Sequence, residues 1–293
     1  MLSGSLVAII TPMNEDGSIN FDKMGELIEY HIENKTDGIV LLGTTGEAST
    51  MTFEEEKELV AFAAEKIAKR VPLVVGSGSN NTSTAVENSK AFAENGADML
   101  LVVTPYYNRA NDGGMIRHFE LIANSVNVPI ILYNVPGRTG CSLSPAVVEV
   151  LSKHPNINGI KEASGDISYA VKLAPLLSED FVMYSGNDDI IIPMLSLGAR
   201  GVISVWANIM PKEVHDLVTL YLEGKQKEAL AIQTGYLDLV DVLFCETNPI
   251  PVKHAMNELG FEVGPLRMPL GEMDEPNYRK LVATIDKYKE VLS

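Results

Sequence analysis

Residues 99–134 read MLLVVTPYYNRANDGGMIRHFELIANSVNVPIILYN, and this stretch carries the pattern that decides the fold. Two short apolar runs, at 99–103 and 130–134, flank a longer amphipathic segment. Continuous apolar runs of this length are typical of strands buried on both faces of a parallel sheet, and parallel strands need a crossover connection, usually a helix. The stretch therefore predicts one βα unit followed by the strand of the next unit.

The same alternation recurs along the chain and predicts about eight strands. The candidate strands lie at residues 6–10, 38–42, 73–76, 99–103, 130–134, 157–161, 181–185 and 201–204. Eight parallel strands alternating with helices are what a closed (β/α)8 TIM barrel requires. A doubly wound open sheet is the competing fold, but it usually shows a Gly-rich turn after its first strand. Thr11-Pro12-Met13 follows that strand here, so we expect the barrel.

From about Pro211 onward the pattern is helical and no convincing strand follows. Gly224 and several prolines interrupt this part of the chain. We expect residues 1–222 to form the barrel and residues 223–293 to form a C-terminal helical subdomain that is closely joined to it.

Three helices of the barrel can be placed from their ends. Residues 53–69 repeat apolar side chains at helical spacing after Thr52, a plausible N-cap, with glutamates in the first turn. Residues 82–94 show a similar pattern. Residues 144–153 begin with Ser144 as the N-cap and a proline at the first helical position.

Composition excludes several classes of partner. The chain has 293 residues, with 23 basic against 39 acidic side chains, and its formal charge of −16 repels nucleic acids and anionic membrane surfaces. Cys141 and Cys245 lie far apart and outside any zinc spacing, which favours a reducing, cytoplasmic setting. No apolar segment approaches the roughly 20 residues needed to cross a bilayer. The five histidines show no metal-binding spacing, so no metal is expected.

Lys161 is the first candidate for chemistry, because it ends the apolar run at 157–161. Active sites of barrels lie at the carboxyl ends of the strands. A free lysine amine has a pKa of about 10.4, and burial lowers that pKa by disfavouring the ammonium form. A neutral lysine amine attacks carbonyl groups to form a Schiff base. The alternative interpretation is a solvated lysine at a strand end.

Other polar residues follow the strands. The Gly43–Glu47 turn, GTTGE, has glycines that let backbone N–H groups approach a ligand and hydroxyls that can hold a carboxylate or relay protons. Tyrosines at 106, 107 and 133 end the fourth and fifth strands, where a phenol can exchange protons with a lysine adduct. Arg138, on the following loop, suits a substrate carboxylate. The alternatives are an ordinary turn, packing tyrosines and a solvated arginine.

Several motifs together resemble the dihydrodipicolinate synthases, now called 4-hydroxy-tetrahydrodipicolinate synthases, over nearly the whole chain. The motifs are GTTGE at 43–47, YY at 106–107, YNVPGRTG at 133–140, IKEASGD at 160–166, GNDD at 186–189 and NPIPVK at 248–253. The resemblance implies a lyase of the class I aldolase type that condenses pyruvate with L-aspartate 4-semialdehyde. This reaction begins the diaminopimelate route to lysine, and the resemblance implies neither a metal nor an organic cofactor.

The resemblance also implies a catalytic set. Lys161 would form the Schiff base, and Tyr133 would be the central proton donor and acceptor. Thr44 would link Tyr133 to Tyr107, which in the family reaches across a tight dimer interface into the neighbouring site. Hydroxyls rather than carboxylates are expected around the amine, since a nearby carboxylate would favour the ammonium form.

For substrate binding, the resemblance implies Thr45 with nearby backbone amides for the pyruvate carboxylate and Arg138 for the carboxylate of the aldehyde. Gly186 and Ile203 would line the pocket. Members of the family are commonly homotetramers, built as dimers of dimers, and occasionally dimers. We therefore expect this chain to self-associate.

One group of residues departs from the feedback-sensitive relatives. Their lysine site corresponds to Ala48, Ser49, Phe53, Glu56, Asn80, Thr84 and Tyr106 of this chain. Such relatives typically carry histidine in place of Phe53, histidine or another polar group in place of Glu56, and glutamate in place of Thr84. We therefore expect weak or absent inhibition by lysine.

Two rival functions share much of the pattern. A sister Schiff-base lyase, such as N-acetylneuraminate lyase or a keto-deoxy sugar acid aldolase, would use the same lysine and tyrosine. Arg138 argues against it, because those relatives usually lack an arginine in this loop. A non-catalytic keto-acid-binding regulator would keep the barrel, but here all the relay residues are present.

Overall fold

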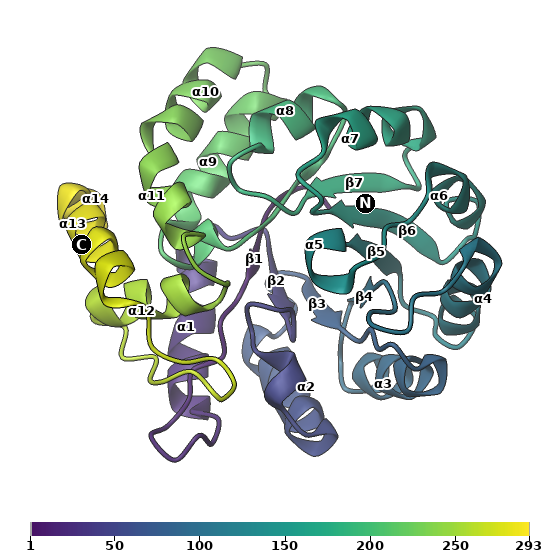
Figure 1. Cartoon of the computed structure of the whole chain (residues 1–293), viewed down its shortest axis with the longest axis horizontal. Helices are drawn as coiled ribbons and strands as arrows, with labels where there is room; N and C mark the ends of the chain where they lie inside the picture. Colours follow the sequence, from purple (N-terminus) through teal and green to yellow (C-terminus); the bar gives the residue numbers. More distant parts are fainter. Residues whose placement is uncertain (1, 293) are drawn as a thin grey trace.

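The computed structural model describes residues 2–292, which form a closed barrel of eight parallel strands (Figure 1). The strands follow one another around the barrel in chain order, and the last pairs with the first. They are β1 Gly4–Ala8, β2 Gly38–Leu41, β3 Leu73–Gly76, β4 Met99–Val103, β5 Ile130–Asn134, β6 Ile157–Glu162, β7 Val182–Ser185 and β8 Gly201–Ser204. The predicted (β/α)8 barrel is confirmed.

The first strand lies earlier in the chain than the sequence predicts. Residues 9 and 10 are apolar and fully buried, as a strand would require, but the ladder ends at Ala8. The reason is a change of hydrogen-bond partner: the Ile10 amide donates to the side chain of Asn208 at 3.1 Å instead of to a neighbouring strand. Burial of apolar side chains alone does not distinguish a strand from the loop that continues it.

Helices surround the barrel on its outside (Figure 1). The α-helices are α1 Phe21–Glu33, α2 Phe53–Ile67, α3 Thr82–Glu94, α4 Asp112–Ala123, α5 Pro136–Thr139, α6 Pro145–Leu151, α7 Ile167–Leu173, α8 Ile191–Ser196, α9 Pro211–Leu222, α10 Gln226–Gly235, α11 Leu237–Leu243, α12 Ile250–Glu258, α13 Glu275–Lys287 and α14 Lys289–Leu292. Short 3-10 turns are η1 Ala48–Thr50, η2 Ala174–Leu176 and η3 Trp206–Asn208.

The predicted helix ends are largely confirmed. Thr52 caps α2 in a capping box with Glu55, and Ser144 caps α6. Helix α2 ends at Ile67, two residues before the predicted end, because Ala68 and Lys69 adopt left-handed backbone conformations with φ of 50° and 60°. A residue in that conformation cannot continue a right-handed helix.

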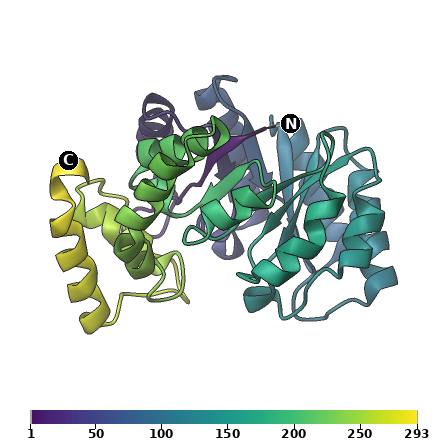
Figure 2. The same ribbon diagram turned by 90° about the horizontal axis from the view of Figure 1, so that it is seen from above.

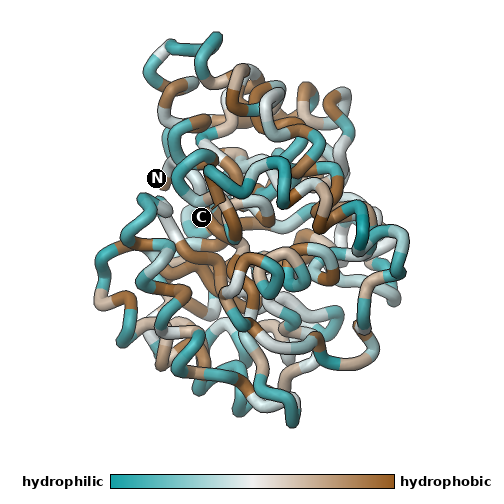
Figure 3. The backbone as a smooth tube through the Cα atoms, turned by 90° about the vertical axis from the view of Figure 1, so that its left-hand side faces the viewer, coloured by the Kyte–Doolittle hydropathy of each residue, from teal (hydrophilic) through white to brown (hydrophobic). Residues whose placement is uncertain are grey.

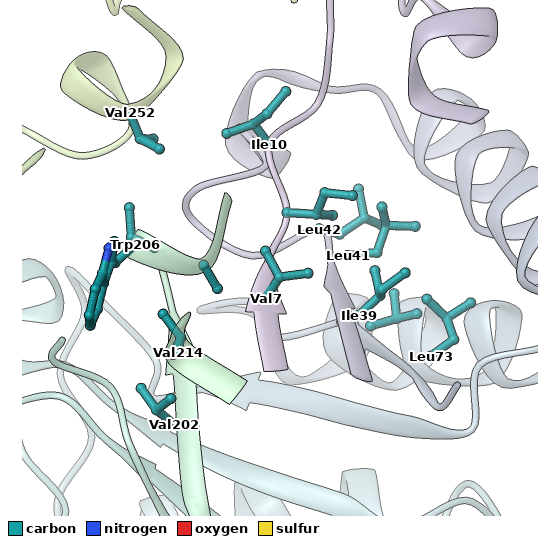
Figure 4. Packing of buried hydrophobic residues seen from close by; sticks show 14 of the residues in the cluster. Val7, Ile10, Ile39, Leu41, Leu42, Leu73, Val202, Trp206, Val214 and Val252 are labelled. Atoms are coloured by element: carbon teal, nitrogen blue, oxygen red, sulfur yellow. The ribbon is translucent and has the colours of Figure 1, made fainter. Parts of the chain in front are cut away.

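The hydrophobic core has two layers. The smaller layer fills the barrel interior with alternate side chains of the strands, among them Leu6, Val40, Val74 and Ile131. The larger layer lies between the outer face of the strands and the helices, where Val7, Val202, Val214 and Trp206 pack (Figure 4). Trp206 is fully buried and is a packing residue. Figure 3 shows hydrophobic segments concentrated inside and hydrophilic ones at the periphery.

The chain after α9 is helical, as predicted. Helix α9 packs on β1 and β8, and α10 packs on α8 and α9. Helices α11, α12 and α13 pack on one another, and the last helices stand to one side of the barrel (Figure 2). Val252 of α12 reaches into the same outer core as the barrel strands (Figure 4). Within residues 2–292, no helix is long and apolar enough to span a membrane.

Candidate active site

The residues singled out from the sequence come from the carboxyl ends of different strands. A cavity of about 440 Å³ opens there, and its lining includes Thr44, Tyr106, Tyr133 and Arg138. Thr44 follows β2, Tyr106 follows β4 and Arg138 follows β5, whereas Tyr133 lies within β5 near its end. The closed barrel gathers strand ends that are far apart in the sequence, because all parallel strands end on the same rim.

Lys161 lies beside Tyr133 at this rim. The two residues are partners in the register of β5 and β6, and the Lys161 amine lies 4.5 Å from the centre of the Tyr133 ring. Both side chains are buried, with exposures of 7% and 8%. The alternative of a solvated lysine at a strand end is therefore wrong.

Glu162, the next residue along β6, points away from the amine. Side chains alternate across a strand, so a residue adjacent to an inward-facing lysine faces outward. Its carboxylate accepts hydrogen bonds from Asn134 Nδ2 and from the Ser164 backbone N–H, both at 2.7 Å. Burial raises the pKa of Glu162, and these two hydrogen bonds oppose that rise. Glu162 thus ties the ends of β5 and β6 together without contacting the catalytic face.

Asp188 is a buried carboxylate whose pKa is influenced by the charge of Lys161. It is fully buried in the loop after β7, and its Oδ2 accepts from the backbone N–H groups of Val205 and Trp206, at 2.9 Å each. Burial raises its pKa, and among the opposing influences is the positive charge of Lys161. The sequence motif GNDD signalled this loop, but it did not distinguish the buried Asp188 from its exposed neighbour Asp189.

The Gly43–Glu47 loop after β2 presents its two threonines differently. Thr44 lines the cavity. Thr45 is buried, and its Oγ1 accepts a 2.9 Å hydrogen bond from Nδ2 of Asn248, which precedes α12. A hydroxyl that accepts one hydrogen bond still has its own proton to donate. The structure records no hydrogen bond from Thr44 to Tyr133 or Tyr107 within residues 2–292.

Arg138 is exposed on α5 and faces the cavity. One end of its guanidinium is fixed, because Nη2 donates to the backbone oxygen of Asn248 at 2.8 Å. Five N–H donors make up a guanidinium, so the others remain for a ligand. Asn248 thus contacts both the Gly43–Glu47 loop after β2 and Arg138 after β5. The sequence signalled Asn248 only through the motif NPIPVK.

Tyr107 is not among the residues that line the cavity, and neither is Lys161. Tyr107 is 91% exposed, and its backbone has a left-handed φ of 69°. Its neighbour Tyr106 lines the cavity and is 40% exposed. The two adjacent tyrosines therefore lie in different surroundings: Tyr106 lines the cavity, and the Tyr107 side chain is exposed on the surface.

Gly186 and Ile203 occupy the ends of β7 and β8. A side chain at residue 186 would place its Cβ 2.4 Å from Cβ of Ala163, so only glycine fits beside the loop after β6. The Gly186 amide donates to the Glu162 backbone oxygen at 2.7 Å. Ile203 is 1% exposed and belongs to the barrel interior. Both therefore lie at the rim, but neither lines the cavity that Thr44 and Tyr133 share.

Potential metal ligands do not cluster in the chain from residue 2 to residue 292. No three His, Cys, Asp or Glu side chains come together there in an arrangement that could hold a metal ion. The thiols of Cys141 and Cys245 are both free.

Comparison with known proteins agrees with this arrangement. The model of the dihydrodipicolinate synthetase family matches residues 1–288. The 4-hydroxy-tetrahydrodipicolinate synthases of Clostridium tetani and Thermoanaerobacter sp. (strain X514) are 55% and 52% identical to this chain. The first match covers 96% of both chains, and the second covers 98% of this chain and 97% of the relative.

Solved structures give the same result. The crystal structure of dihydrodipicolinate synthase from Aquifex aeolicus superimposes with a TM-score of 0.96 at 42% identity, and the match covers 99% of each chain. The chloride-inhibited enzyme from Acinetobacter baumannii, crystallised with pyruvate, has a TM-score of 0.96 at 40% identity, also over 99% of each chain. Fold and site thus define a (β/α)8 lyase of the class I aldolase type. Within that class, the chain belongs to the dihydrodipicolinate synthetase family.

Proposed function

We propose that this protein is a 4-hydroxy-tetrahydrodipicolinate synthase that condenses pyruvate with L-aspartate 4-semialdehyde through a Schiff base on Lys161. The observation that carries the proposal is the buried Lys161 amine, 4.5 Å from the centre of the Tyr133 ring at the carboxyl rim of the barrel. Relatives at 50% identity or more over nearly the full chain bear this name, which supports the choice of substrates.

The reaction follows from the chemistry of an amine and a 2-oxo acid. The neutral Lys161 amine adds to the keto carbon of pyruvate, and loss of water gives a protonated imine. The imine draws electrons from the methyl group, which loses a proton to give an enamine. The enamine carbon then bonds to the aldehyde carbon, whose oxygen takes up a proton. The amino group of the second substrate finally attacks the imine carbon, closes the ring and releases Lys161.

Tyr133 would transfer protons in these steps, because its ring lies 4.5 Å from the amine and its phenol can both donate and accept a proton. Thr44, on the same cavity wall, would link Tyr133 to Tyr107 of a neighbouring protomer. The 91% exposure of Tyr107 supports its reaching another chain. On this proposal an isolated protomer has an incomplete relay and low activity.

Substrate binding would involve two fixed loops. Thr45 and nearby backbone amides would hold the pyruvate carboxylate, and Arg138 would hold the carboxylate of the aldehyde with the N–H groups that Asn248 leaves free. Gly186 and Ile203 would shape the rim around the adduct. We further propose a cytoplasmic homotetramer or homodimer, since the proposed relay needs a second chain.

Lysine should inhibit this enzyme weakly or not at all. Phe53, one of the departures from feedback-sensitive relatives, is engaged in packing, with its ring 6.3 Å from that of Phe92. Glu56 and Thr84 line the cavity, but burial and the nearby Glu55 raise the pKa of Glu56 to about 7, which weakens it as a partner for an ammonium group. Turnover measured with and without millimolar lysine tests this, and strong inhibition would contradict it.

Borohydride trapping is the most direct test of the proposed function. Incubation with pyruvate and borohydride should add one reduced pyruvate to the chain, and peptide mapping by mass spectrometry should place it on Lys161. A coupled assay with aspartate semialdehyde should then show turnover that N-acetylneuraminate and keto-deoxy sugar acids do not. Preference for a sugar acid would establish the sister lyase instead, and an adduct without any turnover would favour a keto-acid-binding regulator.

A further inference from the structure

Glu47 closes the loop that carries Thr44 and Thr45. Its backbone is left-handed, with φ of 58°, and its N–H donates to the backbone oxygen of Thr44 at 3.1 Å. The backbone oxygen of Glu47 in turn accepts hydrogen bonds from the N–H and the hydroxyl of Thr50. The position of Glu47 therefore determines where this short turn sits relative to the barrel rim.

The side chain of Glu47 is held by a lysine from a distant part of the chain. Lys253 of α12 lies 2.6 Å from Glu47 Oε1, and the two side chains are 1% and 0% exposed. The second carboxylate oxygen, Oε2, accepts the backbone N–H of Arg267 at 2.8 Å. Both oxygens thus bond to the segment after residue 248, and Arg267 pairs separately with Glu55 of α2.

A buried ion pair of this kind adds little to the stability of the fold. Removing two charges from water costs about as much as their attraction returns, and buried ion pairs can often be replaced by apolar side chains without loss. Burial lowers the pKa of Lys253, whereas Glu47 raises it and supports the charged form. Neither residue is part of the lining of the cavity that Thr44 and Tyr133 share. What the pair fixes is the distance between α12 and the β2 loop.

We propose that Glu47 and Lys253 form a positioning pair that fixes the Gly43–Glu47 loop, so that Thr44 and Thr45 are held ready for the 2-oxo acid. The structural basis is the 2.6 Å buried contact at the end of a turn only a few residues long. The inference rests on the proposed function, because it assigns a purpose to the geometry of the pyruvate site. Neither residue was singled out by the sequence for such a role.

The test is the affinity for pyruvate, measured without the second substrate. Glu47→Gln keeps the shape of the side chain but removes its charge. The pyruvate concentration that gives half-maximal borohydride trapping on Lys161 should rise about tenfold, since small displacements of positioning groups have large effects on reactive complexes. Unchanged trapping in a folded Glu47→Gln variant would overturn the proposal.

A matched control separates positioning from stability. Glu55→Gln removes the Arg267 pair of the same network but leaves both contacts of Glu47 intact. It should lower the melting temperature without changing the pyruvate dependence. If Glu55→Gln and Glu47→Gln shift the pyruvate dependence equally, the Glu47 pair has no special role.

A second variant covers the case in which Glu47→Gln does not fold. The double variant Glu47→Leu/Lys253→Met replaces the buried pair by apolar side chains of similar size, and it should fold yet still require about tenfold more pyruvate. Normal pyruvate dependence in the double variant, or failure of both variants to fold, would show a purely structural role. Absence of trapping in the unmodified protein would instead refute the proposed function.

Discussion

The barrel and the helices that follow α9 contribute to the site in different ways. The barrel carries every side chain of the predicted catalytic set, from Thr44 to Lys161, on strand ends and the loops after them. The later helices carry none of that set. This later part of the chain supplies three buried polar side chains that bond to loops of the barrel. They are Gln233, Asn248 and Lys253.

Two of these residues bond to the Gly43–Glu47 loop, and the third bonds to the loop after β7. Asn248 contacts Thr45 and Arg138, and Lys253 contacts Glu47. Gln233 of α10 donates to the backbone oxygen of Asp188 at 2.8 Å. The difference between the two regions teaches that the predicted reactive groups and the groups that bond to their loops are separated in the chain, since a catalytic geometry needs support from surrounding residues.

Replacing Lys161 should have the largest effect of any single change. Lys161→Ala removes the amine that would form the covalent adduct, and we expect turnover to fall by at least about 10³-fold with the melting temperature little changed. The coupled assay and borohydride trapping measure this. Lys172→Ala, an exposed lysine on α7, serves as the control and should keep full activity. Undiminished turnover of Lys161→Ala would remove the basis of the proposed mechanism.

Two interior tyrosines give the next comparison. Tyr133→Phe removes the proposed proton carrier at the carboxyl rim and should lower kcat about 10²-fold. Tyr184→Phe changes a fully buried tyrosine whose hydroxyl donates to the Leu2 backbone oxygen at 2.6 Å. It should cost about 1 kcal/mol of stability and leave kcat unchanged. Equal kinetic effects of the two variants would show that Tyr133 has no special part in proton transfer.

Acid should lower the free energy of unfolding, because two histidines on helices around the barrel are buried. Burial lowers the pKa of His31 on α1 to about 3 and that of His118 on α4 to about 4. The unfolded chain binds a proton on each with a pKa of about 6.5, so this stability is present above pH 6.5 and is lost as pH falls toward the folded values. His31→Gln should reduce the slope of unfolding free energy by about 1.4 kcal/mol per pH unit between pH ~4 and ~6.

Urea unfolding at several pH values measures that slope. The comparison between the variant and the unmodified protein isolates the histidine from the carboxylates that also titrate in this range. Identical slopes would show that His31 is protonated in the folded barrel.

The smallest effect should come from the helical region. Asn248→Ala removes the hydrogen bond to Thr45 but leaves the backbone oxygen that accepts from Arg138, so half-saturating pyruvate should rise about threefold. Asn257→Ala is the matched control, because the Asn257 side chain bonds to backbone groups of Gly264 and Val263 and does not line the cavity of Thr44 and Tyr133. If half-saturating pyruvate rises with Asn257→Ala but not with Asn248→Ala, the hydrogen bond from Asn248 to Thr45 does not support the pyruvate site.

Much of the fold could be predicted because its signals are local. Apolar runs at 99–103 and 130–134 coincide with β4 and β5, and the capping residues Thr52 and Ser144 begin α2 and α6. The first strand was misplaced by two residues, because Asn208 takes over hydrogen bonding there from another part of the chain. Local periodicity reports burial and spacing, whereas a change of partner is a long-range event.

Some features of the candidate site could also be predicted from the sequence, and others could not. A lysine at a strand end, hydroxyls in a Gly-rich turn and an arginine after Tyr133 are visible in the residues themselves. The burial of Asp188 and the packing of Glu47 against Lys253 are not visible there, since both depend on how the loops and α12 pack on the barrel.

The sequence by itself determined which chemistry is available and that eight strand ends would present it together, because side-chain type and periodicity are properties of neighbouring residues. Only the tertiary structure decided which charges and amides meet across 203 and 206 residues, at Thr45–Asn248 and Glu47–Lys253. Those contacts follow from the close packing of helices on a closed barrel, where a shift of one turn would bring different side chains to the rim.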